Sequence, residues 1–256
     1  MENKNRLVLA MGALGLSLIV ATALGAFVFY KVKSSEGSVL SVTGSADQII
    51  SSDTVKWTSA FSRNVAPDKL KDGNVQIATD LKTIMAYFKQ SGVADNEITV
   101  NPVTISPLCD SQNNVIYDKT GNPNCAGNNI SGYSLQESII VESSRVNDIT
   151  DLTRKSSDYL IAKGLVFSTQ SLEYYYNKLA DLRLELLTKA TENAKERATR
   201  IAQSTGAKIN FLQSAATGVF QVTAKNSVDV SDYGVYDTTS IDKKITAVVK
   251  ASFSLK

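Results

Sequence analysis

The sequence predicts an α+β fold in which helices are layered on a largely antiparallel sheet, preceded by one transmembrane helix. Two patterns lead to this prediction. Short segments of alternating apolar residues are bounded by turn residues, and between them apolar residues recur every three or four positions. Hydrophobic residues make up 43% of the 256 residues, which is enough to bury a core. After the N-terminal helix, the expected order of elements is ββαββαβαββ.

An uncharged apolar segment lies near the start of the chain. It runs from Leu7 to Tyr30 and exceeds the ~20 residues that cross a hydrocarbon layer as a helix. A cleaved signal peptide is the alternative, because Ala21 to Ala23 fits a small-x-small cleavage site. Since the apolar run continues past that site, we expect residues 1–33 to anchor the protein in the lipid bilayer. Residues 34–256 are then expected on the extracytoplasmic side of the cell membrane.

The first part of the remaining domain predicts two strands and a helix. Val39–Gly44 and Thr54–Phe61 are rich in β-branched and aromatic residues and partly alternate. Pro67 opens a helix, and Gly92 ends it after Lys89. Its apolar residues fall on one face: Leu70, Ile77, Leu81, Ile84 and Phe88.

Two further strands, Ile98–Ile105 and Tyr133–Val141, are expected to form a hairpin. They flank a segment rich in Asn, Asp, Gly and Pro that contains the only two cysteines, Cys109 and Cys125. Because an exported domain folds in an oxidising compartment, we expect a disulfide that closes the loop 109–125. Two free surface thiols are the alternative.

The second half of the domain predicts two helices with strands between and after them. Val146–Lys163 has an apolar face and is followed by Gly164. The longer helix, Asn177–Ser204, carries alanines along one stripe of its second half, and Gly206 ends it. Small residues on that stripe would let the helix lie close to a sheet. The expected strands are Leu165–Tyr174, Ile209–Val222 and Ile245–Leu255.

The composition argues against common enzymatic chemistry. Histidine is absent, which removes the commonest general base, the Ser-His-Asp and Cys-His arrangements and every metal site that uses histidine. No spacing of carboxylates singles out another centre, so we expect no catalytic, cofactor-binding or metal-binding residue. The chain has 27 Lys and Arg against 25 Asp and Glu, and this near balance disfavours nucleic acid as a partner.

Several short motifs occur together in one order. They are Val42-Thr43-Gly44, Gly92-Val93, Gly132-Tyr133, the alanine ladder from Ala190 to Gly206, and the alternating C-terminal strand. With these motifs, the chain from Ser38 to Lys256 resembles the SIMPL-domain family, exported or envelope proteins that include a bacterial periplasmic immunogenic protein. The resemblance implies an α+β fold, ring-like or channel-like homo-oligomers and no established catalytic residues.

We therefore expect a non-catalytic, membrane-anchored extracytoplasmic domain that self-associates, as an envelope assembly or a stress-related scaffold. Val39–Gly44 and Ile245–Leu255 are candidate sheet edges for that association, unless they pair with each other within one chain. One alternative function is binding of a small ligand or glycan. Another is a hydrolase that uses Glu173 or Asp181 beside Tyr174 to Tyr176.

Overall fold

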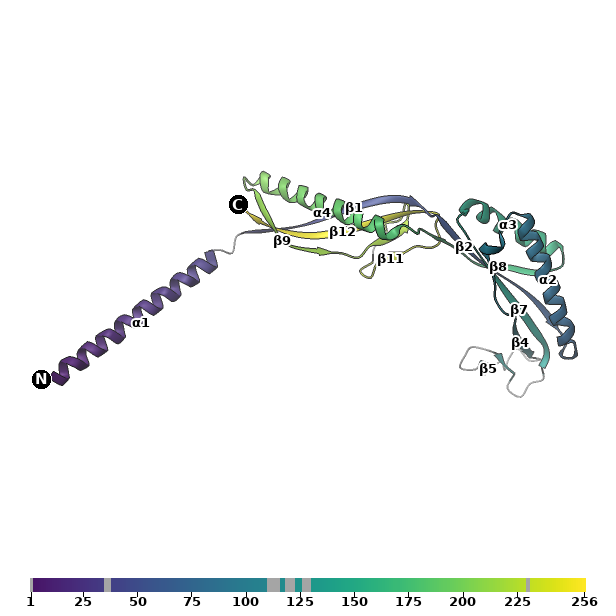
Figure 1. Ribbon diagram of the computed structural model, residues 1–256, viewed down its shortest axis with the longest axis horizontal. Helices are drawn as coiled ribbons and strands as arrows, with labels where there is room; N and C mark the ends of the chain where they lie inside the picture. The colour runs from purple at the N-terminus through teal and green to yellow at the C-terminus, as the bar shows by residue number, and fades with distance from the viewer. Residues whose placement is uncertain (1, 35–37, 110–115, 118–122, 126–129, 229–230) are drawn as a thin grey trace. The chain divides into compact units, whose positions relative to one another are not determined.

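The structure is a computed structural model (Figure 1). It describes the chain except residues 1, 35–37, 110–115, 118–122, 126–129 and 229–230. The chain forms two compact units. Unit 1 comprises residues 1–46, 186–218 and 247–256, and unit 2 comprises residues 47–185 and 219–246.

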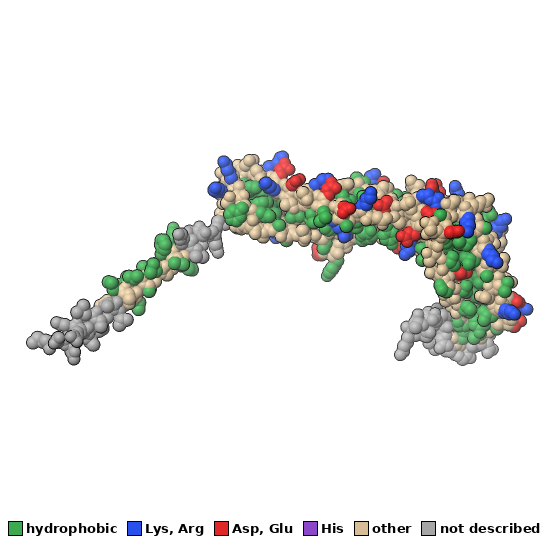
Figure 2. Space-filling view, in the orientation of Figure 1, with side chains coloured by type: hydrophobic (Ala, Val, Ile, Leu, Met, Phe, Trp, Pro, Cys, Tyr) green, Lys and Arg blue, Asp and Glu red, His purple; other side chains and the backbone are tan. Residues whose placement is uncertain are grey.

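The N-terminal segment is helix α1, Glu2–Ser34 (Figure 1). Its large apolar side chains between Leu16 and Tyr30 are exposed, and Figure 2 shows the hydrophobic surface that they form on this helix. The sequence predicted that Leu7–Tyr30 is a transmembrane helix in front of the folded domain. The structure contradicts this prediction: among the described residues, no helix is both long and apolar enough to cross a membrane.

Unit 1 contains three neighbouring strands of a five-stranded sheet. The last residues of β12, Asp242–Leu255, lie between the first residues of β1, Val39–Ser51, and strand β9, Ile209–Thr217. β9 and β12 are antiparallel, with a regular register that pairs Ser214 to Thr217 with β12 and an irregular one toward Ile209. β1 also runs antiparallel to β12, because the amide of Leu255 donates to the Ser38 carbonyl at 2.8 Å while the hydroxyls of Ser41 and Ser252 meet at 2.8 Å.

Helix α4, Leu179–Ser204, packs against the unit 1 sheet through small side chains. Its second half buries one alanine per turn, each at most 1% exposed: Ala190, Ala194, Ala198 and Ala202. This stripe lies against Val42 and Gly44 of β1 and against Ala251 and Phe253 of β12. The prediction that small residues bring this helix close to a sheet is confirmed. The opposite face of α4 is charged, as Figure 2 shows, and Arg200 pairs there with Glu196 at 2.6 Å.

The main sheet of unit 2 is antiparallel and has β7 and β2 at its centre. β2 pairs with β7 on one side and with β8 on the other, and the far side of β7 pairs with β3 and β4. The predicted strand Ile98–Ile105 is two short strands, which Asn101 to Val103 separate. The bounds are Thr54–Val65 for β2, Ile98–Val100 for β3, Thr104–Cys109 for β4, Ile130–Ser143 for β7 and Val166–Tyr175 for β8.

Two helices cover one face of this sheet: α2, Leu70–Gln90, and α3, Val146–Ala162 (Figure 1). Between them and the sheet lies an aromatic core. Trp57 of β2 is fully buried, and its ring centroid lies 5.1 Å from that of Phe88 and 6.1 Å from that of Phe167. Short 3-10 turns precede α2, at Pro67–Lys69, and follow it, at Asp95–Glu97.

The remaining strands of unit 2 are short. β10, Gln221–Ala224, pairs antiparallel with the first residues of β12 and parallel with β11, Val235–Tyr236. The predicted strand Ile209–Val222 is thus divided into β9 and β10. In the loop between the cysteines, β5, Ile116–Tyr117, pairs with β6, Pro123–Asn124. The predicted α+β class with largely antiparallel sheets is confirmed.

Candidate functional site

Cys109 at the end of β4 and Cys125 form a disulfide, as the sequence predicted. The bond ties the end of one strand of the β4–β7 hairpin to the connecting loop, across a sequence separation of 16. Closing such a loop removes conformations from the unfolded chain and stabilises by ~3 kcal/mol in the chain-entropy model. Much of the loop, including 110–115 and 118–122, lies outside the described residues.

Strand β9 is the most exposed strand of unit 1. It has β12 on one side, and no other described strand pairs with it. Every residue from Asn210 to Thr217 is exposed, including Phe211 at 59% and Leu212 at 46%. The strand contains no charged residue and no proline, although these residues commonly protect natural sheet edges from pairing. β9 therefore presents unpaired backbone groups beside apolar side chains.

The two strands that the sequence singled out as sheet edges pair with each other. β1 lies next to β12, and β12 is an interior strand of the sheet. This is the alternative that the sequence left open, and it removes Ile245–Leu255 as an edge. β9 is the edge on the other side of β12. Sequence reasoning missed its role because alternation predicts a strand without saying which neighbour it lacks.

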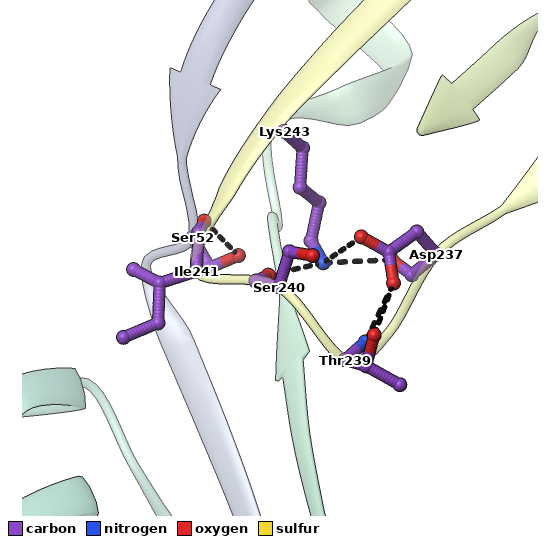
Figure 3. A network of polar contacts seen from close by, with 6 residues as sticks. All are labelled: Ser52, Asp237, Thr239, Ser240, Ile241 and Lys243. Carbon is purple, nitrogen blue, oxygen red and sulfur yellow. Dashed lines mark hydrogen bonds and ion pairs between the residues drawn. The ribbon is translucent and has the colours of Figure 1, made fainter. Parts of the chain in front are cut away.

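Unit 2 contains a buried lysine, Lys243 of β12, whose side chain is 1% exposed. Figure 3 shows its ammonium group pointing into the turn that precedes the strand. Nζ donates to the carbonyl oxygens of Asp237 at 2.7 Å and Ser240 at 2.6 Å, and lies 3.9 Å from the Asp237 carboxylate. Burial lowers the pKa of Lys243, and the charge of Asp237 opposes that change.

The Asp237 carboxylate organises the same turn. Its Oδ1 accepts hydrogen bonds from the amide and the hydroxyl of Thr239, both at 2.8 Å. Burial alone would raise the pKa of Asp237, but hydrogen bonds from Thr239 and Ser240, with the charge of Lys243, lower it below its ordinary value. Ser52 holds the end of the turn at Ile241, because the Ser52 amide and hydroxyl both donate to the Ile241 carbonyl at 2.9 Å (Figure 3).

Lys243, Asp237, Thr239, Ser240 and Ser52 thus form a cluster, the Lys243 cluster, that supports the turn 237–241. The ammonium group of Lys243 donates hydrogen bonds to two carbonyls and lies near one carboxylate. Because the side chain is buried, a substrate has almost no access to it. A nucleophilic lysine needs a neutral amine that a substrate can reach. The arrangement can hold a loop in place, and it offers no route for turnover. Sequence reasoning missed the buried lysine, because Lys243 and Lys244 are adjacent and only the strand register decides which one is buried.

The two carboxylates of the hydrolase that the sequence left open lie on different elements of the structure. Glu173 is half-buried on β8, opposite Lys56, whereas Asp181 is exposed in the first turn of α4. No hydrogen bond or ion pair joins these two carboxylates in the described part of the chain. Tyr174 is buried, with its hydroxyl 3.0 Å from that of Thr150, so it packs in the core. Burial raises the pKa of the neighbouring Tyr175, and Glu173 adds to that rise.

The described residues contain no group of three or more Cys, Asp or Glu side chains that could hold an ion.

Glu137 of β7 is a buried acid, 7% exposed, and burial raises the pKa of its carboxyl group. A raised pKa in the folded state contributes stability below the unfolded pKa, and this contribution is lost as the pH rises through the folded pKa. We therefore expect Glu137→Gln to be more stable than the unchanged protein at pH 7, with a difference that shrinks as the pH falls toward 4.5. Urea unfolding followed by Trp57 fluorescence at several pH values measures this. The exposed neighbour variant Gln136→Glu should show no such trend, and a pH-independent difference for Glu137→Gln would contradict the assignment.

Comparison with known proteins identifies a family. A family model named SIMPL and described as "Protein of unknown function (DUF541)" matches residues 40–253. No curated protein matches the sequence. The matched region begins in β1 and ends in β12, so it contains the alanine ladder of α4 and the whole main sheet of unit 2. Because the match covers most of the chain, this protein belongs to the SIMPL family.

Proposed function

We propose that this protein is a non-catalytic domain that self-associates outside the cytoplasm, and that β9 is the strand through which copies meet. The observation that carries the proposal is the uncharged β9 edge, exposed on both faces. An unprotected edge of this kind is a template for another strand, since its amides and carbonyls gain partners when a second chain is added.

The side chains of β9 add to this backbone template. Phe211 and Leu212 would bury apolar surface on pairing, at ~25 cal/mol per Å². The near balance of acidic and basic residues keeps repulsion between copies small. β1 ends the same sheet on its other side, so an edge-to-edge contact between β9 of one copy and β1 of the next is head-to-tail. Contacts of that type close into rings when the rotation between copies permits.

The disulfide supports the proposed location. Bonds such as Cys109–Cys125 form and persist in oxidising compartments and are rare in the cytosol. The absence of histidine and the fully engaged Lys243 favour a scaffold over a hydrolase.

The test is to place a charge on the edge. Leu212→Lys adds a residue type that natural edges use against pairing, at a position that is exposed in the single chain. Val75→Lys, on an exposed position of α2 in unit 2, is the matched control. We expect the full chain and Val75→Lys to form the same oligomer by light scattering over a range of concentrations, while Leu212→Lys dissociates at concentrations at least about tenfold higher than either.

Any association through α1 is common to all three proteins, so the comparison isolates β9. If the unchanged chain is monomeric at every concentration, or if Leu212→Lys associates as strongly as Val75→Lys, assembly through β9 is excluded.

A further inference from the structure

A cleft of about 400 Å³ lies in unit 2 between the end of α2 and the first turns of α3. Its size is within the range of small-molecule sites. The lining residues are Tyr87 of α2, Ser91 directly after it, and Arg145, Asp148, Asp151, Leu152 and Lys155 at and along α3. None of them belongs to β9 or to the Lys243 cluster, so the cleft is separate from both.

At one end of the cleft, the Arg145 side chain is held in place by Glu97, which is not a lining residue. Arg145 donates from one guanidinium nitrogen to Glu97 Oε2 at 2.6 Å. Glu97 also accepts from the Ser143 hydroxyl at 2.5 Å and from the Ala94 amide at 2.9 Å. Burial alone would raise the pKa of Glu97, but these hydrogen bonds and the charge of Arg145 lower it, so the carboxylate that fixes the guanidinium stays ionised.

Arg145 keeps donors for a ligand. Within the described chain, its guanidinium group has no hydrogen-bonded partner besides Glu97. Its side chain is 37% exposed. A guanidinium group carries five N–H donors in a fixed fork that suits carboxylates, and the ones not used by Glu97 remain available at the cleft.

The aromatic wall of the cleft is also fixed. Tyr87 stacks on Tyr159 of α3, with ring centroids 4.2 Å apart and an interplanar angle of 14°. Lys163 lies over the Tyr159 ring at 5.7 Å. A ring that is already ordered costs little further entropy when a ligand packs against it.

The charges along the cleft follow a pattern. Positions 145, 148, 151 and 155 are three or four residues apart, so they share one side of α3 and its N-terminus. Their order is cation, anion, anion, cation. Asp148 and Lys155 form no ion pair within the described residues, and Asp151 forms an ion pair with the exposed Arg154 at 3.6 Å. Two carboxylates thus lie between two cations beside an ordered ring.

We infer that this cleft binds a small zwitterion, a free amino acid or a short peptide. The ligand's carboxylate is bound by Arg145, its ammonium group by Asp148 and Asp151, and its side chain lies against Tyr87. Lys155 at the far end would bind a second carboxylate, such as that of an acidic side chain in the ligand.

Calorimetric titration of the full chain with the dipeptide alanylalanine tests this inference. Propionate supplies only the carboxylate and ethylamine only the ammonium group. We expect the dipeptide to bind at least about tenfold more tightly than either half, because both charges are recognised only when both are present. Binding of propionate as tight as that of the dipeptide would reduce the site to a general anion contact and overturn the inference.

Asp148→Asn removes one ammonium contact without touching the hydrogen bonds behind Arg145. Asp158→Asn, the same change on an exposed position of α3 outside the cleft, is its control. We expect the dipeptide's affinity to fall at least about tenfold in Asp148→Asn and to stay unchanged in Asp158→Asn. Equal affinities of the two variants for the dipeptide would exclude the proposed site. The absence of any heat of binding for the unchanged chain at 10 mM dipeptide would exclude it as well.

Discussion

Replacing Gly44 with valine is expected to destabilise unit 1 by at least about 3 kcal/mol. A Cβ at this position would collide with the Ala190 carbonyl oxygen and the Ala194 amide nitrogen, and would lie 2.7 Å from the Ala194 Cβ. The first two are backbone atoms of α4, which cannot move aside as a flexible side chain can. Helix α4 would have to move away from β1, and its alanine stripe would lose its packing against the sheet.

Hydrogen exchange of the α4 amides measures this effect in unit 1 directly. Gly218→Ala is the control, because a Cβ there would meet only Val248, at 3.4 Å or more, which is ordinary contact. We expect faster exchange along Ala190 to Ala202 in Gly44→Val and little change in Gly218→Ala. Unchanged protection in Gly44→Val would mean that α4 does not depend on its close approach to β1.

Replacing Lys243 with methionine is expected to destabilise unit 2 by about 3 kcal/mol. The change keeps most of the side-chain volume but leaves the carbonyls of Asp237 and Ser240 without their donor and the Asp237 carboxylate without its counter-charge. Urea unfolding followed by Trp57 fluorescence reports on this unit. Lys82→Met, on an exposed position of α2 in the same unit, should change the unfolding free energy by less than about 0.5 kcal/mol.

A second substitution separates the cost of the unpaired Asp237 carboxylate from the cost of the lost hydrogen bonds to the two carbonyls. Asp237→Asn removes the carboxylate, so the double variant Lys243→Met/Asp237→Asn should recover part of the stability that Lys243→Met loses. If Lys243→Met unfolds at the same urea concentration as the unchanged protein, the buried ammonium group is not a support for the turn.

Much of this fold can be predicted from the sequence, because local signals such as helix-ending glycines agree with the pattern of buried side chains. Gly92 and Gly164 end their helices with positive φ values of 86° and 82°, a conformation that glycine adopts without strain. The alanine stripe of α4 predicted a close approach to a sheet, and that approach is observed.

Other features depend on which distant strands become neighbours, and local patterns do not contain that information. The sequence predicts a strand both at β9 and at β12, yet one is an edge and the other is an interior strand. Lys243 is buried only because its side chain points to the turn that supplies its acceptors. The cleft at Arg145 brings together α2, α3 and the residues around Glu97, which no single stretch of sequence joins.

The pairing of β1 with β12 has a consequence for how the chain folds during synthesis. The Ser41 hydroxyl meets that of Ser252, 211 positions later, so the unit 1 sheet cannot close until β12 has left the ribosome. The main sheet of unit 2 needs only residues 54–175 and can form well before that. The nascent β1 must therefore wait as an unpaired strand whose one charged residue is Asp47, a state prone to pairing with another nascent chain. A stop codon that removes β12 would make this exposure permanent, and such a truncated product should aggregate.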